Sequence, residues 1–196
     1  MKKIRLYFDT EFTELSKKGE LISLALVSEN NEIFYAEFDD FPIKTCNEWV
    51  IQNVIPNLLF KDRDFFLKSS GGACYIKDAS GRIADALCNW FSELGNVEIY
   101  ADCPAFDWVF FCNLFGTAFD IPKEVFYMPF DLAAFLKYRG IDPDINREGF
   151  VKKHKGQAFI KKIRLKAAGL HNALYDALLV KAAFEIIETE IRGVLV

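Results

Sequence analysis

The sequence predicts a single α/β domain with a central mixed sheet of five to six strands flanked by helices. Three apolar runs near the N-terminus, at residues 4–8, 21–28 and 33–38, have the composition of β-strands. The polar residues 29–32 separate the last two runs, so the three form an antiparallel meander. Helical and strand-like runs then alternate along the chain, which is typical of a sheet that continues with parallel strands.

Capping residues and glycines set the expected limits of the later elements, because Asp, Ser and Pro favour helix starts and glycine favours helix ends. Residues 47–68 are expected to hold a short helix and an irregular segment, followed by a loop at 69–72. The remaining expected elements are a helix capped by Asp78 or Ser80 and ended by Gly95, a strand at 97–101, a helix at 106–115, an apolar run at 125–130, a helix at 132–138 capped by Asp131, a loop at 142–149 and a long helix at 172–191.

The composition fits one folded domain over residues 1–196, because 52% hydrophobic and 15% aromatic residues argue against disorder. The longest apolar stretches, such as 108–111 and 177–180, are far shorter than the ~20 residues that cross a bilayer, so we expect no membrane span. The N-terminus shows no small-residue cleavage site, and we expect no signal peptide. Five cysteines without a CxxC motif favour a reduced, cytoplasmic protein.

Two carboxylates follow the first strand closely. Asp9 and Glu11 are two residues apart, so in a strand their side chains share a face. Two carboxylates held that close repel one another unless a cation or a proton is shared between them. A divalent metal ion would resolve this repulsion.

Three more residues complete a candidate metal centre. Asp107 lies in the first turn of the helix that follows strand 97–101, and His171 precedes Asp176 by five residues at the start of the last helix. Each has an ordinary structural explanation alone, but loop ends of a shared sheet are where sites gather in α/β proteins. Oxygen ligands with at most one histidine suit Mg²⁺ or Mn²⁺, and two such ions ~3.5–4 Å apart catalyse displacement at phosphorus. His171, with an ordinary pKa of ~6.5, is the expected general base.

A local cationic stretch suggests a polyanionic partner although the net charge is −4. Residues 151–170 contain His154 and no Asp or Glu, and this stretch runs directly into His171. A solvated surface is the ordinary interpretation, but the position favours contact with nucleic-acid phosphates, above all through Lys162 and Lys166. The basic residues are Lys152, Lys153, Lys155, Lys161, Lys162, Arg164 and Lys166.

Three segments resemble the motifs of the DEDDh 3′-to-5′ exonucleases. They are Asp-Thr-Glu-Phe-Thr at 9–13, Ala-Asp-Cys-Pro-Ala-Phe-Asp at 101–107 and His-Asn-Ala-Leu-Tyr-Asp at 171–176. That family is ribonuclease H-like and includes RNase T, oligoribonuclease and the polymerase proofreading subunit. The short, single-domain form of the chain and its opening Asp-Thr-Glu-Phe motif are most similar to the small RNase T-like 3′ exoribonucleases of bacteria and phages. The resemblance implies a ribonuclease H-like fold and release of 5′-mononucleotides from single-stranded 3′ ends.

The resemblance also implies roles for the five residues. Asp9 would bridge two metal ions, Glu11 and Asp176 would complete the site of the water-activating ion, Asp107 would serve the second ion, and His171 would be the general base. Relatives such as RNase T act as homodimers, so a homodimer whose basic stretch serves the partner's active site is a further expectation from the resemblance.

The chain departs from the common pattern at two places that concern substrate contact. Asp102 and Pro104 stand where the second motif commonly carries Asn, and Phe12 stands where many relatives have Thr.

Aromatic residues near the acids are candidates for stacking on bases. Phe12 is the strongest of them, whereas core packing is at least as good an explanation for Phe106 and Trp108. The family also implies that the backbone around Thr10 and Thr13 approaches the terminal nucleotide.

RNA is the favoured polymer. The alternatives are a DNA-directed exonuclease of the same fold, a nucleic-acid-binding module without turnover, and a hydrolase of free nucleotides.

Overall fold

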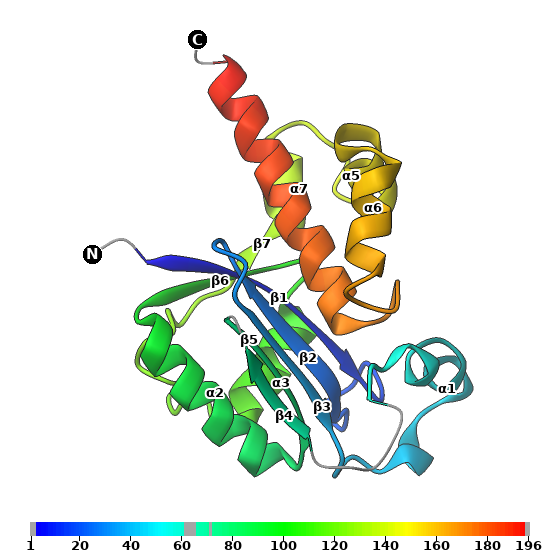
Figure 1. Cartoon of the computed structure of the whole chain (residues 1–196), viewed down its shortest axis with the longest axis vertical. Coiled ribbons are helices and arrows are strands. Elements are labelled where there is room, and N and C mark those ends of the chain that lie inside the picture. Colours follow the sequence, from blue (N-terminus) through cyan, green and yellow to red (C-terminus); the bar gives the residue numbers. More distant parts are fainter. Residues whose placement is uncertain (1–2, 61–65, 71, 195–196) are drawn as a thin grey trace.

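A computed structural model of the chain describes residues 3–60, 66–70 and 72–194, with the side chains of 66–70 and 190–194 left aside. One seven-stranded sheet runs through it in the order β4-β5-β3-β2-β1-β6-β7 (Figure 1). The strands are β1 (Ile4–Phe12), β2 (Leu21–Ser28), β3 (Ile33–Phe38), β4 (Phe66–Ser70), β5 (Ala73–Asp78), β6 (Val97–Ala101) and β7 (Phe130–Asp131).

The pairing confirms the predicted fold class. β1, β2 and β3 form the antiparallel meander, while β6 pairs parallel to β1 and β5 pairs parallel to β3. β7 consists of two residues paired parallel to β6, so six longer strands carry the sheet. The arrangement of meander and parallel strands is that of a ribonuclease H-like fold.

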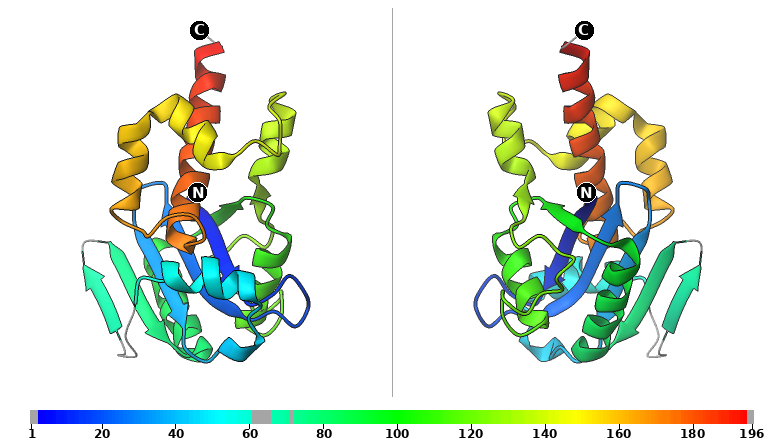
Figure 2. Two further views of the ribbon diagram at one scale, coloured as in Figure 1. Left: turned by 90° about the vertical axis from the view of Figure 1, so that its right-hand side faces the viewer. Right: turned by 90° about the vertical axis from the view of Figure 1, so that its left-hand side faces the viewer.

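Helices cover both faces of the sheet (Figures 1 and 2). The two larger cores lie on opposite faces of the sheet, one beneath α2 with α3 and the other beneath α7 with α4, α5 and α6, and a small third cluster joins Ile22 of β2 to Val50 of α1. Every residue of β2 and β3 is buried, because alternate side chains enter the two cores. The helices are α1 (Glu48–Asn53), α2 (Ser80–Leu94), α3 (Ala105–Leu114), α4 (Leu132–Tyr138), α5 (Arg147–Lys155), α6 (Gln157–Arg164) and α7 (Ala173–Val194), with short 3₁₀ turns η1 (Ile43–Thr45) and η2 (Ile55–Asn57).

The structure corrects two local expectations. Residues 66–70 form β4 instead of an irregular segment and the start of a loop, and they pair with β5, for which no element was predicted; Gly71 of the expected loop lies outside the described residues. The apolar run at 125–130 contributes one isolated bridge and the start of β7. The expected loop at 142–149 ends early, because the Asn146 side chain accepts the Gly149 N–H at 2.7 Å and starts α5 at Arg147.

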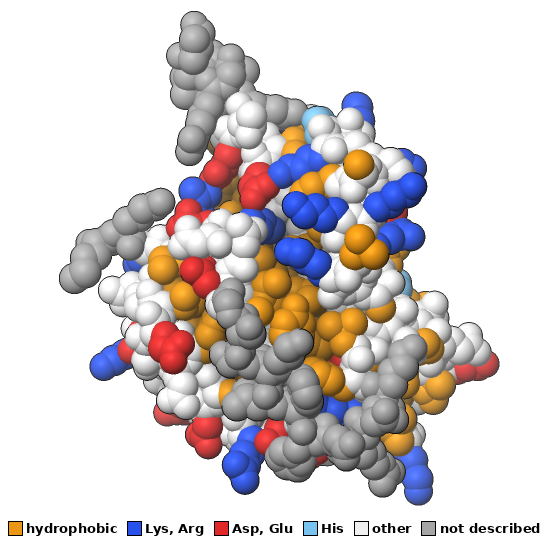
Figure 3. Space-filling model, in the orientation of Figure 1, with side chains coloured by type: hydrophobic (Ala, Val, Ile, Leu, Met, Phe, Trp, Pro, Cys, Tyr) orange, Lys and Arg blue, Asp and Glu red, His pale blue; other side chains and the backbone are white. Residues whose placement is uncertain are grey.

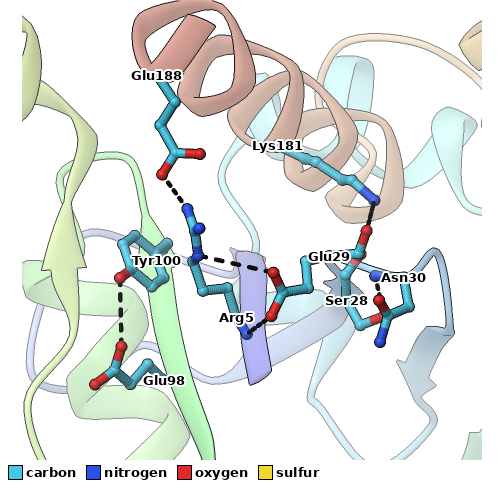
Figure 4. Close-up of polar contacts among 8 residues, drawn as sticks. All are labelled: Arg5, Ser28, Glu29, Asn30, Glu98, Tyr100, Lys181 and Glu188. Atoms are coloured by element: carbon cyan, nitrogen blue, oxygen red, sulfur yellow. Dashed lines mark hydrogen bonds and ion pairs between the residues drawn. The ribbon is translucent and has the colours of Figure 1, made fainter. Parts of the chain in front are cut away.

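Paired charges hold the end of α7 on the start of β1 (Figure 4). Arg5 forms ion pairs with Glu29 at 3.9 Å and with Glu188 of α7. The buried ammonium group of Lys181 donates to the carbonyl oxygens of Ser28 at 2.7 Å and of Glu29 at 3.1 Å, and to the Asn31 side chain at 2.8 Å. These contacts satisfy the cations at this end of the sheet.

Among the described residues we find no helix with the length and apolarity that crossing a bilayer requires.

Candidate active site

The end of β1 and the start of α7 bring the first and last of the predicted acidic residues together. Asp9 and Glu11 lie near the end of β1, and the register with β2 shifts at a bulge just after Glu11. α7 crosses β1 and begins beside this end of the strand, with Asp176 in its first turn. Potential ligand atoms of Glu11, His171 and Asp176 all lie within 4.8 Å of one another.

Asp107 is held near this group by Thr10, the residue between Asp9 and Glu11 on β1. The Thr10 N–H and hydroxyl both donate to Asp107 Oδ1, at 3.1 and 2.6 Å. Thr10 thus ties the first turn of α3 to the end of β1. Its hydroxyl is buried and used in this contact.

His171 lies in the loop immediately before α7, as the five-residue spacing required. Its backbone has a φ of 62°, the left-handed region, and its N–H donates to Asp176 Oδ2 at 2.9 Å. Asn172 then starts the helix, because its side-chain oxygen accepts the N–H groups of Leu174 at 3.1 Å and Tyr175 at 3.2 Å. The local sequence therefore turns the chain sharply and places His171 and Asp176 on the same side.

In the part of the chain that the structure describes, the four carboxylates lack a cationic partner. Among the described residues, no Lys or Arg forms an ion pair with Asp9, Glu11, Asp107 or Asp176. Burial raises the pKa of Asp9 well above its ordinary value, and the charges of Asp176, Asp107 and Glu11 raise it further.

The other acids respond in the same direction. Burial, followed by the charges of Asp176 and Asp107, raises the pKa of Glu11 to about 8. Burial is also the main cause that raises the pKa of Asp176 to about 7 and that of Asp107 above its ordinary range. Burial instead lowers the pKa of His171, which favours the neutral imidazole. An oxygen-rich group of this kind fits a hard divalent cation.

Aromatic side chains border this group. Phe12 packs against Phe110 and Phe106 with ring centroids 5.0 and 6.3 Å apart, and Phe106 is 37% exposed. Trp108 stacks on the buried Phe111 at 5.3 Å, which fits a packing role.

Sequence reasoning missed Trp49. Its ring, 52% exposed, makes an edge contact with the His171 ring at 4.8 Å. The nearby turn is bonded to the loop before α7, since the Asn57 side chain donates to Leu170 O and Asn172 donates to Asn57 O. No local signal marks Trp49, because only the folding of α1 against that loop brings it to His171.

Of the remaining predicted substrate contacts, the Thr13 side chain is engaged within the protein, and Lys162 and Lys166 lie elsewhere. Thr13 is buried and its hydroxyl accepts the Glu20 N–H at 3.1 Å. Lys162 and Lys166 line a pocket of about 150 Å³ with Leu178 and Lys181 of α7. At 3.6 residues per turn, Leu178 and Lys181 lie on the side of α7 away from Asp176. The structure therefore does not bring Lys162 and Lys166 together with the acidic group.

The cationic stretch forms α5, α6 and the loop after them. Its Lys and Arg side chains gather over these helices on the face seen in Figure 3. Most of them are exposed, whereas the apolar residues Phe150, Val151, Ile160 and Ile163 are buried in the core with α7.

Comparisons with known proteins point in one direction. Two curated relatives, both named 3′-5′ exoribonuclease, come from Mycobacterium tuberculosis strains CDC 1551 and H37Rv. Each is 27% identical to this chain over 124 residues, which covers 62% of this chain and 67% of the relative. No family model matches the chain.

Proposed function

We propose that this protein is a metal-dependent 3′-to-5′ exonuclease of the DEDDh type that releases 5′-mononucleotides from single-stranded 3′ ends or 3′ overhangs, with RNA preferred. The observation that carries the proposal is the grouping of Glu11 and Asp176 with His171, close to two further carboxylates, Asp107 on Thr10 and Asp9 on β1. Among the described residues, none of the four carboxylates forms an ion pair with Lys or Arg. The similarity to proteins named 3′-5′ exoribonuclease supports the direction of attack and the choice of polymer.

The four carboxylates would hold two Mg²⁺ or Mn²⁺ ions. When bound, such ions activate a water molecule and stabilise the leaving oxygen at phosphorus. Bound divalent cations would relieve the repulsion among these carboxylates, which supports the assignment.

His171 would accept the proton of the attacking water. Partial burial favours its neutral form, which is the form that accepts a proton. The bond from its backbone N–H to Asp176 fixes the loop that carries the ring.

The aromatic rings beside the acidic group would hold the 3′ end of the nucleic acid. Base stacking on a ring contributes ~1–3 kcal/mol per base in single-strand binding. Trp49 and the Phe12–Phe106 pair lie beside the acidic group and keep exposed ring surface, so we assign them to the terminal bases. The five free cysteines fit a reducing compartment, and we place the enzyme in the cytoplasm.

The decisive experiment compares wild type and Asp9→Ala on 5′-labelled single-stranded RNA, single-stranded DNA and duplexes with 3′ overhangs, in Mg²⁺, Mn²⁺ or EDTA. We expect stepwise shortening from the 3′ end by wild type with a metal ion, and none by Asp9→Ala. Glu98→Gln is the matched control, because Glu98 lies at the start of β6 and pairs with Lys3. Full activity of Asp9→Ala would refute the proposal. Binding without shortening would support a non-catalytic module, and faster shortening of DNA would correct the polymer.

A further inference from the structure

Asp102 is a fifth carboxylate at the same edge of the sheet. β1 and β6 are parallel, and Phe8 pairs with Ala101, so Asp102 leaves β6 beside the point where Asp9 sits on β1. Its charge contributes to the raised pKa values of Asp9, Asp107 and Asp176. Asp102 is therefore electrostatically part of the acidic group.

Within the described residues, Asp102 differs from the other four carboxylates because it has a cationic partner. Arg147, the first residue of α5, donates from Nε to Asp102 Oδ2 at 2.6 Å and from Nη2 to Asp102 Oδ1 at 2.8 Å. The pair is partly buried, with the two side chains 16% and 23% exposed. A planar guanidinium that bonds both carboxylate oxygens neutralises their charge and occupies one lone pair of each, which makes Asp102 a weaker metal ligand.

The surroundings explain why this carboxylate needs a partner. Asp102, Cys103 and Asp131 offer ligand atoms within 4.8 Å of one another, a grouping able to compete for a cation. Asp131 Oδ1 already accepts the N–H groups of Cys103 at 3.1 Å and Ala133 at 2.9 Å. Asp102 has no such backbone donors among the described contacts, and Arg147 supplies the charge instead.

We propose that Arg147 is a positioning residue that neutralises Asp102 and keeps this fifth carboxylate out of the divalent-cation site formed by Asp9, Glu11, Asp107 and Asp176. The inference rests on the proposed function, because it assumes that this group binds the catalytic ions. It assigns Arg147 no contact with substrate.

A charge cycle tests the inference. We would titrate Mn²⁺ into wild type, Arg147→Met, Asp102→Asn and the double variant by calorimetry, and measure kcat on single-stranded RNA. Arg147→Met exposes a negative charge, so Mn²⁺ binding should tighten by roughly threefold to tenfold while kcat falls. Asp102→Asn leaves a free positive charge, so Mn²⁺ binding should weaken by a similar factor. The double variant should return toward wild type in both measurements.

A purely structural role predicts a different result. Arg147 also donates to Ile145 O at 2.6 Å and to Pro143 O at 2.8 Å, so its loss removes an anchor of the loop before α5. If anchoring is its only role, the double variant will be at least as impaired as Arg147→Met, and this result overturns the inference. Lys3→Met, which breaks the Lys3–Glu98 pair at the other end of β6, should leave Mn²⁺ binding and kcat at wild-type values.

The measurements distinguish a failure of the proposed function from a failure of the role proposed for Arg147. A wild-type protein that neither binds Mn²⁺ nor shortens RNA would overturn that function. A wild-type protein that does both, with Mn²⁺ affinities unchanged across the cycle, would overturn only the role of Arg147.

Discussion

β1 and α7 pack against each other and carry charged residues at both ends, but the two ends are balanced in opposite ways. At the start of β1, Arg5 pairs with Glu29 and Glu188 (Figure 4). At its other end, Glu11 meets Asp176 with no cation to balance them among the described residues. The same two elements thus present a compensated and an uncompensated charge cluster.

The contrast between the two ends distinguishes charged residues that stabilise the fold from charged residues that serve the proposed site. Paired groups at the first end hold α7 on the sheet, and their contribution is limited by partial exposure. Carboxylates at the second end raise one another's pKa values and destabilise the metal-free fold. A fold retains such repulsion where the group binds a cation or does chemistry.

The largest expected effect comes from changing one charge at each end of α7. Asp176→Asn should lower the rate of mononucleotide release about 10³-fold, because a ligand of the proposed metal site is lost. The same variant should raise the melting temperature of the metal-free protein, because one member of a repulsive group becomes neutral. Release rates on single-stranded RNA and thermal melts in EDTA measure both effects.

Glu188→Gln is the matched change at the compensated end of the helix. It should leave the release rate unchanged and lower the free energy of unfolding by less than about 1 kcal/mol. If Glu188→Gln abolished turnover, or Asp176→Asn were fully active, the contrast between the two ends would be wrong.

Local signals in the sequence were enough to predict the residues of the acidic end, whereas the ion pairs of Arg5 at the other end were not predicted. A strand composition and a two-residue spacing placed Asp9 and Glu11 on β1, and helical periodicity placed Asp176 at the start of α7. Parallel pairing of β6 with β1 then explains why Asp107 arrives at the same edge. The strand, the two-residue spacing and the last helix depend on residues close together in the chain, whereas the pairing of β6 with β1 joins distant segments.

Features that depend on distant segments were not predictable. Arg147 reaches Asp102 across 45 positions, and Trp49 reaches His171 only after α1 folds beside the last loop. The dense positive charge of 151–170 obscured the apolar positions of α5 and α6, which Gly156 interrupts at a φ of +81°. Burial of Ile160 and Ile163 turns Lys162 away from the acidic group.

A second, smaller effect concerns the proposed base. Since burial lowers the pKa of His171, the release rate should rise with pH at values below the ordinary ~6.5. His171→Ala should lower the rate about 10²-fold and flatten this rise. His154→Ala should retain the rise, because His154 lies in α5 within contact of Phe150 and not in the acidic group. A profile that is unchanged in His171→Ala would remove this residue from proton transfer.

The last expected effect is a pH dependence of stability without metal ions. Folding raises the pKa of Glu11 to about 8 and that of Asp176 to about 7, from ordinary values of ~4. Between these limits the folded state binds more protons than the unfolded state, so the free energy of unfolding in EDTA should fall as pH rises from about 5 to about 8. Denaturant unfolding at several pH values measures this slope.

Adding Mn²⁺, or changing one charged residue of α7, tests whether this pH dependence of stability comes from the acidic group. Saturating Mn²⁺ should reduce the loss of stability at high pH, because a bound cation replaces the protons that the carboxylates would otherwise hold. Asp176→Asn should give a shallower slope than wild type, whereas Glu188→Gln should keep the wild-type slope with a small uniform offset. Equal slopes in all three proteins would mean that the acidic end is as well compensated as the end that carries Arg5.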